Sequence, residues 1–325
     1  MEEKKTGLLP WAKQHLSSLA AYGGLVVCII IFSIVPPFYG ESLWTVEKLS
    51  TFMSNAIVTA LLAVGAVFVY SLGNMDISVG VQVRIYATLM IILGNATGSL
   101  FPGILLSAVI AITIGIVNGA AGQLLKIHPI VPSLVFMMIL QGVSSILYTK
   151  LGTRNIVLKT IDYSIFKNPI VMIVVLAIEV LIVSYLFYYT KYGKSARAIG
   201  ANEKAAEQSG INLLKYKVIC YVIMGVCIVL AAMFQMGYTG AASDSTGTGL
   251  EMDVMVALIL GGMPLSGGMK SKVSCAIIGA FTFSLLAVGL PLIGVAPNMV
   301  FLIKAIIFLI VVLITCRKKD GVLPR

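Results

Sequence analysis

The sequence predicts an all-α polytopic membrane protein, a bundle of about ten transmembrane helices. Of its 325 residues, 59% are apolar and only 11% are charged, and the mean hydropathy is +1.01. A soluble domain is about half apolar and a quarter charged, so an ordinary cytosolic enzyme is excluded. Ten spans of about 20 residues leave roughly 125 residues for termini and loops. The whole chain, 1–325, is therefore expected to form a single transmembrane domain.

Apolar runs predict the spans in order. Irregular backbone exposed to lipid cannot cross a bilayer, so each run is expected to be helical. The first run follows a lysine-containing segment and lacks a small-residue cleavage site, which favours an uncleaved anchor over a signal peptide. The predicted spans are 19–38, 51–72, 79–97, 101–123, 130–148, 169–189, 216–237, 253–267, 273–290 and 298–316.

The net charge of +10 indicates orientation rather than nucleic-acid binding, because the basic residues are spread along the gaps between spans. Most of them lie in the N-terminal segment, in alternate gaps and after the last span. The opposite gaps hold Lys48, Lys150, Arg154, Lys159 and Lys167. Under the positive-inside rule, both termini are expected in the cytoplasm.

No enzymatic constellation is present in the sequence. Gly193-Lys194-Ser195 resembles the tail of a phosphate-binding loop, but Tyr188 occupies the position of its first glycine, so ATP is not expected to bind by that route. His15 and His128 lie apart, and the five cysteines lack metal-ligand spacing. No catalytic residue, metal or cofactor is therefore expected in this chain, and a membrane enzyme is the weakest hypothesis.

Four ionisable residues fall in or beside the apolar runs: Asp76, Arg84, Glu179 and Lys304. Each is costly in hydrocarbon and should face protein, water or a partner. Asp76 lies at an expected cytoplasmic helix start, where capping of free amides is favoured over a proton relay. The sequence assigns no role to the other three.

Polar residues in the spans are candidates for contact with a small polar solute, although contacts between helices are their commoner use. The candidates for a translocation path are Asn55, Asp76, Ser78, Asn118, Gln141 and Ser266.

Two glycine-rich segments, 73–80 and 261–268, both fit the pattern G-[NG]-M-x-[IL]-S-x-G. Repeated interruptions of this kind point to a transport pathway. An internal duplication and a chance coincidence of two helix ends both remain open as explanations.

The basic loop over about 190–215 contains a predicted short helix from Asn202 to Ser209. Asn202 is a good N-cap, alanines fill the middle, and Gly210 ends the helix. Ala205 and Ala206 give it a small-residue face that another protein could approach closely. A cytoplasmic docking helix is therefore favoured over a solvated loop.

Several segments together resemble the ribose-type permeases, the membrane subunits of bacterial monosaccharide ABC importers in the branched-chain amino acid/ribose permease superfamily. Segment 73–80 is similar to their G-G-x-D-L-S-V-G motif. Further matches follow in order along nearly the whole chain: Gly115 to Gly119, His128 to Val131, Gly193 to Ile211, and Gly261 to Gly268. Departures from the pattern are Asn74, Arg84 and Pro264, which affect the expected solute path more than the docking loop.

The resemblance implies a multi-pass protein of the bacterial cytoplasmic (inner) membrane that pairs with a second copy or a homologue. It implies two ABC ATPase subunits, which would bind ATP and Mg, and a periplasmic or lipid-anchored solute-binding protein. The docking loop would be the coupling segment, seated on the ATPase. Its residues would be Gly200, Ala201, Asn202, Ala205, Ala206, Ser209 and Gly210.

The leading functional hypothesis is a permease for a monosaccharide or similar small polyol. Alternatives within the same machinery are a permease for a nucleoside, an autoinducer-like sugar or a branched-chain amino acid. An ion-coupled secondary carrier is a different class. The coupling segment and the lack of paired intramembrane carboxylates disfavour it.

Overall fold

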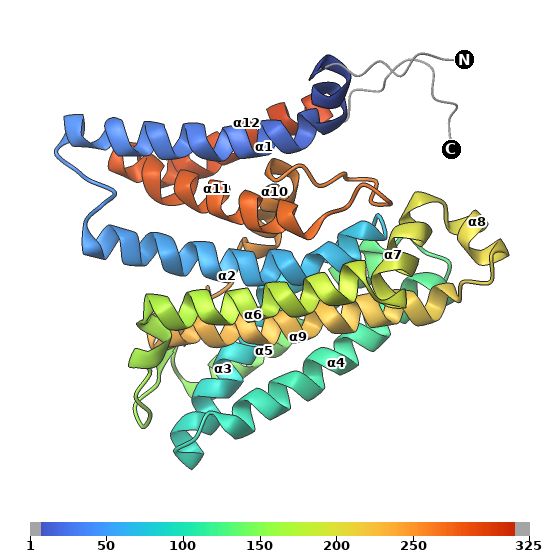
Figure 1. Cartoon of the computed structure of the whole chain (residues 1–325). Coiled ribbons are helices and arrows are strands. Elements are labelled where there is room, and N and C mark those ends of the chain that lie inside the picture. The colour runs from blue at the N-terminus through green and yellow to red at the C-terminus, as the bar shows by residue number, and fades with distance from the viewer. Residues whose placement is uncertain (1–7, 316–325) are drawn as a thin grey trace.

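The computed structural model describes residues 8–315, which form a bundle of long helices (Figure 1). The helices are α1 (Leu8–Ile34), α2 (Val46–Ser71), α3 (Val79–Thr97), α4 (Phe101–Leu124), α5 (Ile130–Leu151), α6 (Pro169–Tyr188), α7 (Lys191–Ala201), α8 (Glu203–Gln208), α9 (Leu213–Thr239), α10 (Leu250–Leu260), α11 (Val273–Leu292) and α12 (Pro297–Thr315). The short elements are the 3₁₀ helices η1 (Pro36–Tyr39) and η2 (Ser164–Lys167) and the strands β1 (Asn155–Val157) and β2 (Ala241–Ser243).

The helices have the length and surface of membrane spans. Within the described residues, eight segments are long and apolar enough to cross a membrane: Ala21–Tyr39 and helices α2, α3, α4, α5, α6, α9 and α11. Large apolar side chains such as Met138, Ile170 and Leu181 are 68%, 71% and 70% exposed on the outer helices. Such a surface suits lipid rather than water. The prediction of an all-α polytopic membrane protein is confirmed.

Helices α2 and α9 form the centre of the bundle. Every residue of α2 from Ala56 to Ser71 is buried. Small residues let neighbours approach closely, as is usual between membrane helices. A Cβ added to Gly65 of α2 would lie 2.5 Å from Cys227 Cβ on α9, and one on Gly119 of α4 would lie 2.7 Å from Val218 Cα. These glycines fix the distances between α2, α9 and α4.

The predicted continuous span over 253–267 is wrong. Helix α10 has 11 residues and ends at Leu260, so at 1.5 Å per residue it covers about 16 Å of a roughly 30 Å hydrocarbon core. The following stretch is irregular. Gly262, Gly267 and Gly268 have φ values of +88°, +67° and +88°, which helices do not allow, and Pro264 removes a backbone donor. The break falls in the glycine-rich segment 261–268 that the sequence marked as an interruption.

The two ends of the bundle differ in structure. At one end, β1 pairs with β2 in an antiparallel arrangement with Asn155 opposite Ser243; we call this the strand end. Nearby, the amide and hydroxyl of Ser164 donate to Asp162, which holds the pKa of that carboxyl below its usual value. Helices α7 and α8 lie at the other end, on the right in Figure 1, which we call the basic end. The charge pattern predicts that the basic end faces the cytoplasm.

Candidate functional site

Helix α8 begins and ends as predicted. The Asn202 side chain accepts a hydrogen bond from the Ala205 amide at 3.0 Å, and Gly210, with φ of +81°, follows the helix. Ala206 is buried, whereas Ala205 and Ser209 are exposed. The helix therefore presents small side chains at the surface of the basic end, where another protein can approach its backbone.

Helix α7 was not predicted, because the sequence was interpreted there as loop. Its N-cap is Thr190, whose hydroxyl accepts from the Tyr192 amide at 3.2 Å. Gly193, Ala196 and Ile199 are buried on one face. Their spacing of three residues is the signal that could have revealed the helix.

Polar contacts attach α7 and α8 to the spans. The Lys217 ammonium on α9 lies 2.7 Å from a Glu203 carboxylate oxygen on α8 and donates to the Gln123 side-chain oxygen on α4 at 2.7 Å. The Arg197 guanidinium on α7 lies over the Phe187 ring of α6 at 5.2 Å. The segment is thus held by α4, α6 and α9 together.

The two glycine-rich segments of the sequence lie against each other at the basic end. The Gly268 amide donates to the Ser71 carbonyl, the last residue of α2, at 2.8 Å. A Cβ on Gly73 would lie 3.0 Å from the Ser266 carbonyl oxygen. The similarity of the two segments in sequence is thus matched by contact in space.

Three of the predicted path residues form one buried network. The Ser78 amide and hydroxyl donate to one Asp76 carboxylate oxygen at 2.9 and 2.6 Å, and the Asn118 amide group donates to the other at 3.2 Å. The Gln82 amide group donates to the Ser78 hydroxyl at 2.7 Å. Asp76 therefore binds a free amide as expected, but in a turn before α3 rather than as the N-cap, which is Ser78.

The other three path candidates lie elsewhere. Asn55 on α2, Gln141 on α5 and Ser266 in the glycine-rich stretch are all exposed in the single chain. The structure does not bring these three together with the Asp76 network. Of the three, Gln141 lines a cavity.

A polar cavity of about 430 Å³ opens between α3, α5 and the strand end. Every lining residue except one glycine has a polar side chain. They are Arg84, Gln141, Ser144, Ser145, Tyr148, Thr149, Gly152, Thr153, Arg154 and Asp244. Its size falls in the range of small-molecule sites. The sequence singled out Gln141 and Arg84 but did not indicate the rest of this group, because its members come from three separate segments.

Arg84 is fixed by groups on the connection between β2 and α10. Its Nε donates to the Thr246 carbonyl at 3.0 Å, and a terminal nitrogen donates to the Thr248 hydroxyl at 2.9 Å. Ser144, only 1% exposed, lines the same cavity with a hydroxyl that has no hydrogen-bond partner among the described residues. The lining thus includes an oriented cationic donor and a residue whose buried hydroxyl has no partner among the described residues.

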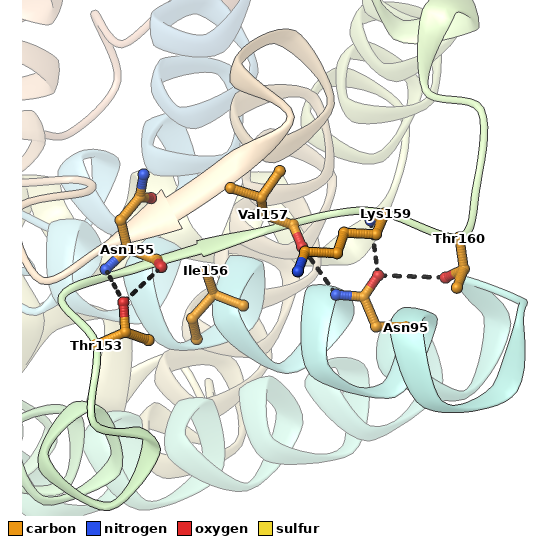
Figure 2. A pocket seen from close by; sticks show the side chains of 7 residues that line it. All are labelled: Asn95, Thr153, Asn155, Ile156, Val157, Lys159 and Thr160. Carbon is orange, nitrogen blue, oxygen red and sulfur yellow. Dashed lines mark hydrogen bonds between the residues drawn. The ribbon is translucent and has the colours of Figure 1, made fainter.

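A second hollow, of about 490 Å³, lies beside β1 (Figure 2). Asn95 on α3 organises it: its amide group donates to the Val157 carbonyl at 2.8 Å, and its oxygen accepts from the Lys159 amide at 2.8 Å and the Thr160 hydroxyl at 3.2 Å. These polar groups bind one another. The hollow is therefore where the loop after β1 is anchored to α3.

The two remaining intramembrane charges are also placed by the structure. The Lys304 ammonium on α12 lies 3.6 Å from an Asp253 carboxylate oxygen on α10 and 4.2 Å from the centre of the Phe283 ring. Glu179 is buried on α6. Among the described residues, no three His, Cys, Asp or Glu side chains are grouped closely enough to hold a metal ion.

The model of one sequence family, described as "Branched-chain amino acid transport system / permease component", matches residues 48–312. The chain belongs to this family. The resemblance to ribose-type permeases that the motifs indicated is confirmed, and the permease is a multi-pass membrane protein.

Relatives of the permease match over nearly their full lengths. The ribose import permease protein of Escherichia coli (strain K12) is 29% identical over 95% of each chain. The galactose/methyl galactoside import permease protein of the same strain is 27% identical over 89% of this chain and 92% of its own. The strain's galactofuranose transporter permease protein is 28% identical over 90% of this chain and 88% of its own. No solved structure matches the permease significantly.

Proposed function

We propose that this permease is the membrane-spanning subunit of an ABC importer for a monosaccharide or similar small polyol. The observation that carries the proposal is the cavity lined by Arg84, Gln141 and Ser144, in which almost every side chain can form hydrogen bonds. A polyhydroxylated solute needs many such partners when it leaves water. Three relatives named for ribose, galactose and galactofuranose transport support the same class.

Energy comes from partner subunits in this proposal. Two ABC ATPases bind ATP and Mg, and α8 docks on one of them through its exposed small residues. The sequence assigned seven residues to this docking segment. Of these, Asn202, Ala205, Ser209 and Gly210 are exposed and are proposed to contact the ATPase. Ala206 is buried, and Gly200 and Ala201 lie on α7 against the end of α2 and the second glycine-rich segment, so these three are proposed to position α8 instead. A solute-binding protein delivers the solute at the strand end, and the permease pairs with a second copy or a homologue.

The path candidates take different parts in this proposal. Gln141 and Ser144 contact the solute, because both line the cavity. Asp76, Ser78 and Asn118 bind one another and set the position of α3, which carries Arg84. Asn55 and Ser266 are exposed in the single chain and stay as candidates for a path shared with a second copy.

Transport then follows from exchange between two states. Closure of the ATPases moves α7 and α8, and the spans shift so that the cavity opens alternately to the two sides. The solute enters from its binding protein and leaves at the basic end.

A permease for a nucleoside, an autoinducer-like sugar or a branched-chain amino acid is the alternative in the same machinery. The cavity disfavours the amino acid, because the lining residues include no Leu, Ile, Val, Met or Phe against which its side chain could pack. An ion-coupled carrier is disfavoured because Asp76 is occupied by Ser78 and Asn118.

The test is a ligand screen. The solute-binding protein encoded beside this permease is challenged with monosaccharides, a nucleoside and leucine, and its thermal shift is measured. The ligand that binds is then added, with its binding protein, to the reconstituted complex. We expect a monosaccharide to bind and to stimulate ATP hydrolysis. Stimulation by leucine alone would contradict the proposal.

A further inference from the structure

Three segments that are distant in sequence meet at one backbone oxygen at the basic end. The Ser71 carbonyl at the end of α2 accepts the Gly268 amide at 2.8 Å. Gly200, in the last turn of α7, packs directly on this pair: a Cβ added to it would clash with the Ser71 oxygen and lie 2.8 Å from the Gly268 nitrogen. We call Gly200, Ser71, Gly73, Gly267 and Gly268 the Ser71 junction.

The junction has no spare room between its backbones. A Cβ on Gly267 would lie 2.5 Å from both the Gly73 nitrogen and the Ser71 oxygen. Gly73, Gly267 and Gly268 also have φ values of +78°, +67° and +88°, which residues with a Cβ rarely adopt. Close packing of this kind transmits displacement rather than absorbing it.

Two stretches of the chain, which we call arms, connect the junction to the polar cavity. The first runs through residues 72–78, held by the Asp76–Ser78 bonds, into α3, where Arg84 lines the cavity. The second runs back along α10 from Gly261 to the connection that holds Thr246 and Thr248. These two residues accept the hydrogen bonds of Arg84. The first arm therefore ends at Arg84, and the second ends at its two acceptors, Thr246 and Thr248.

We propose that the Ser71 junction transmits movement of α7 to the cavity by displacing α3 and α10 relative to each other. Gly200 and Gly268 are positioning residues for coupling, and the Arg84 contact with Thr246 and Thr248 is the place where the displacement reaches the solute. In this proposal α8 binds the ATPase, and α7 passes the movement of the ATPase to the Ser71 junction. This inference rests on the proposed function, because it needs a moving partner at the basic end.

The experiment measures solute transported per ATP hydrolysed in proteoliposomes that contain the full complex. Gly200→Ala is compared with Gly122→Ala on α4, where a Cβ would have ordinary contacts, the nearest at 3.5 Å. We expect Gly200→Ala to assemble and hydrolyse ATP while transport per ATP falls about fivefold or more, the lower range of allosteric coupling. The control should keep the parent ratio. An unchanged ratio in Gly200→Ala would overturn the proposal, because a purely structural defect lowers transport and hydrolysis together.

A milder variant covers the case in which Gly200→Ala does not assemble. The Cβ of Gly268→Ala would lie 3.2 Å from the Ala201 Cα, and its matched control is Gly98→Ala, which has φ of +72° and open space around it. The expected ratio again falls for the junction variant alone, and equal ratios for both would overturn the inference. If the parent complex hydrolyses ATP but transports no solute, the proposed function has failed instead.

Discussion

The Lys217 ammonium on α9 lies 2.7 Å from the Glu203 carboxylate at the start of α8, although Lys217 itself is only 7% exposed. Gln123 on α4 accepts a further hydrogen bond from the same ammonium. A buried cation needs such partners. The pair therefore fixes the short α8 helix to two spans that cross the whole bundle.

Lys217→Met should loosen α8 and destabilise the permease. The loss of hydrogen bonds to a charged group costs about 1.5–3 kcal/mol each, reduced here because Glu203 is half-exposed. Thermal unfolding of the purified permease in detergent measures the effect. Lys204→Met, at an exposed position of α8, is the control and should leave the unfolding temperature unchanged. Equal unfolding temperatures for the two variants would show that the ion pair does not hold the helix.

Asn202→Ala should weaken association with the ATPase by fraying α8. The loss of an N-cap costs about 0.5–2 kcal/mol, and Asn202→Asp should restore binding because its carboxylate can also accept from the Ala205 amide. Copurification with the ATPase is the measurement.

Asn212→Ala serves as the matched control, because Asn212 caps α9 in the same way by accepting from the Lys215 amide at 3.0 Å. It should lower stability without the selective loss of association. If both alanine variants lost the ATPase equally, α8 would not be the docking element.

Ser144→Ala should have opposite effects on stability and transport. The buried Ser144 hydroxyl lacks a partner within residues 8–315, so its removal should stabilise the permease by up to about 1 kcal/mol. Solute uptake should fall, because the same hydroxyl is proposed to bind the solute. Thermal unfolding and uptake are measured on one preparation.

Met138→Leu, an exposed change on the same helix, should alter neither quantity. A Ser144→Ala variant with parent uptake would remove Ser144 from the solute site.

Asp76→Ala should destabilise the permease strongly. It removes the acceptors for the Ser78 amide, the Ser78 hydroxyl and the Asn118 amide group, at about 1.5–3 kcal/mol for each bond to a charged group before relaxation. Asp76→Asn should be much milder, since Asn118 can rotate and present its oxygen, which has no partner within the described part of the chain. Thermal unfolding compares the two. Equal losses would mean that the carboxylate charge, rather than the network, is required.

The features that the sequence predicted correctly depend on neighbours in the chain. The Asn202 cap and the Gly210 stop are local, so composition and spacing identify helix α8. The long apolar helices follow from the same kind of reasoning. Their existence does not depend on how they pack.

The features that were missed depend on contacts between distant segments. The glycine-rich segment 261–268 marked the interruption after Leu260, but not the contact between Gly268 and Ser71 that stabilises it. The polar cavity forms because α5 turns Ser144 and Tyr148 toward Arg84 on α3. The positions of single polar residues along the spans do not indicate which of them line the same cavity in the folded bundle.

The most direct test of the central claim is ATP-dependent uptake of a monosaccharide into proteoliposomes that contain this permease, its ATPase and its solute-binding protein. We expect uptake only when all three proteins and ATP are present. Accumulation of the sugar by the permease alone, driven by an ion gradient and indifferent to ATP, would contradict the account.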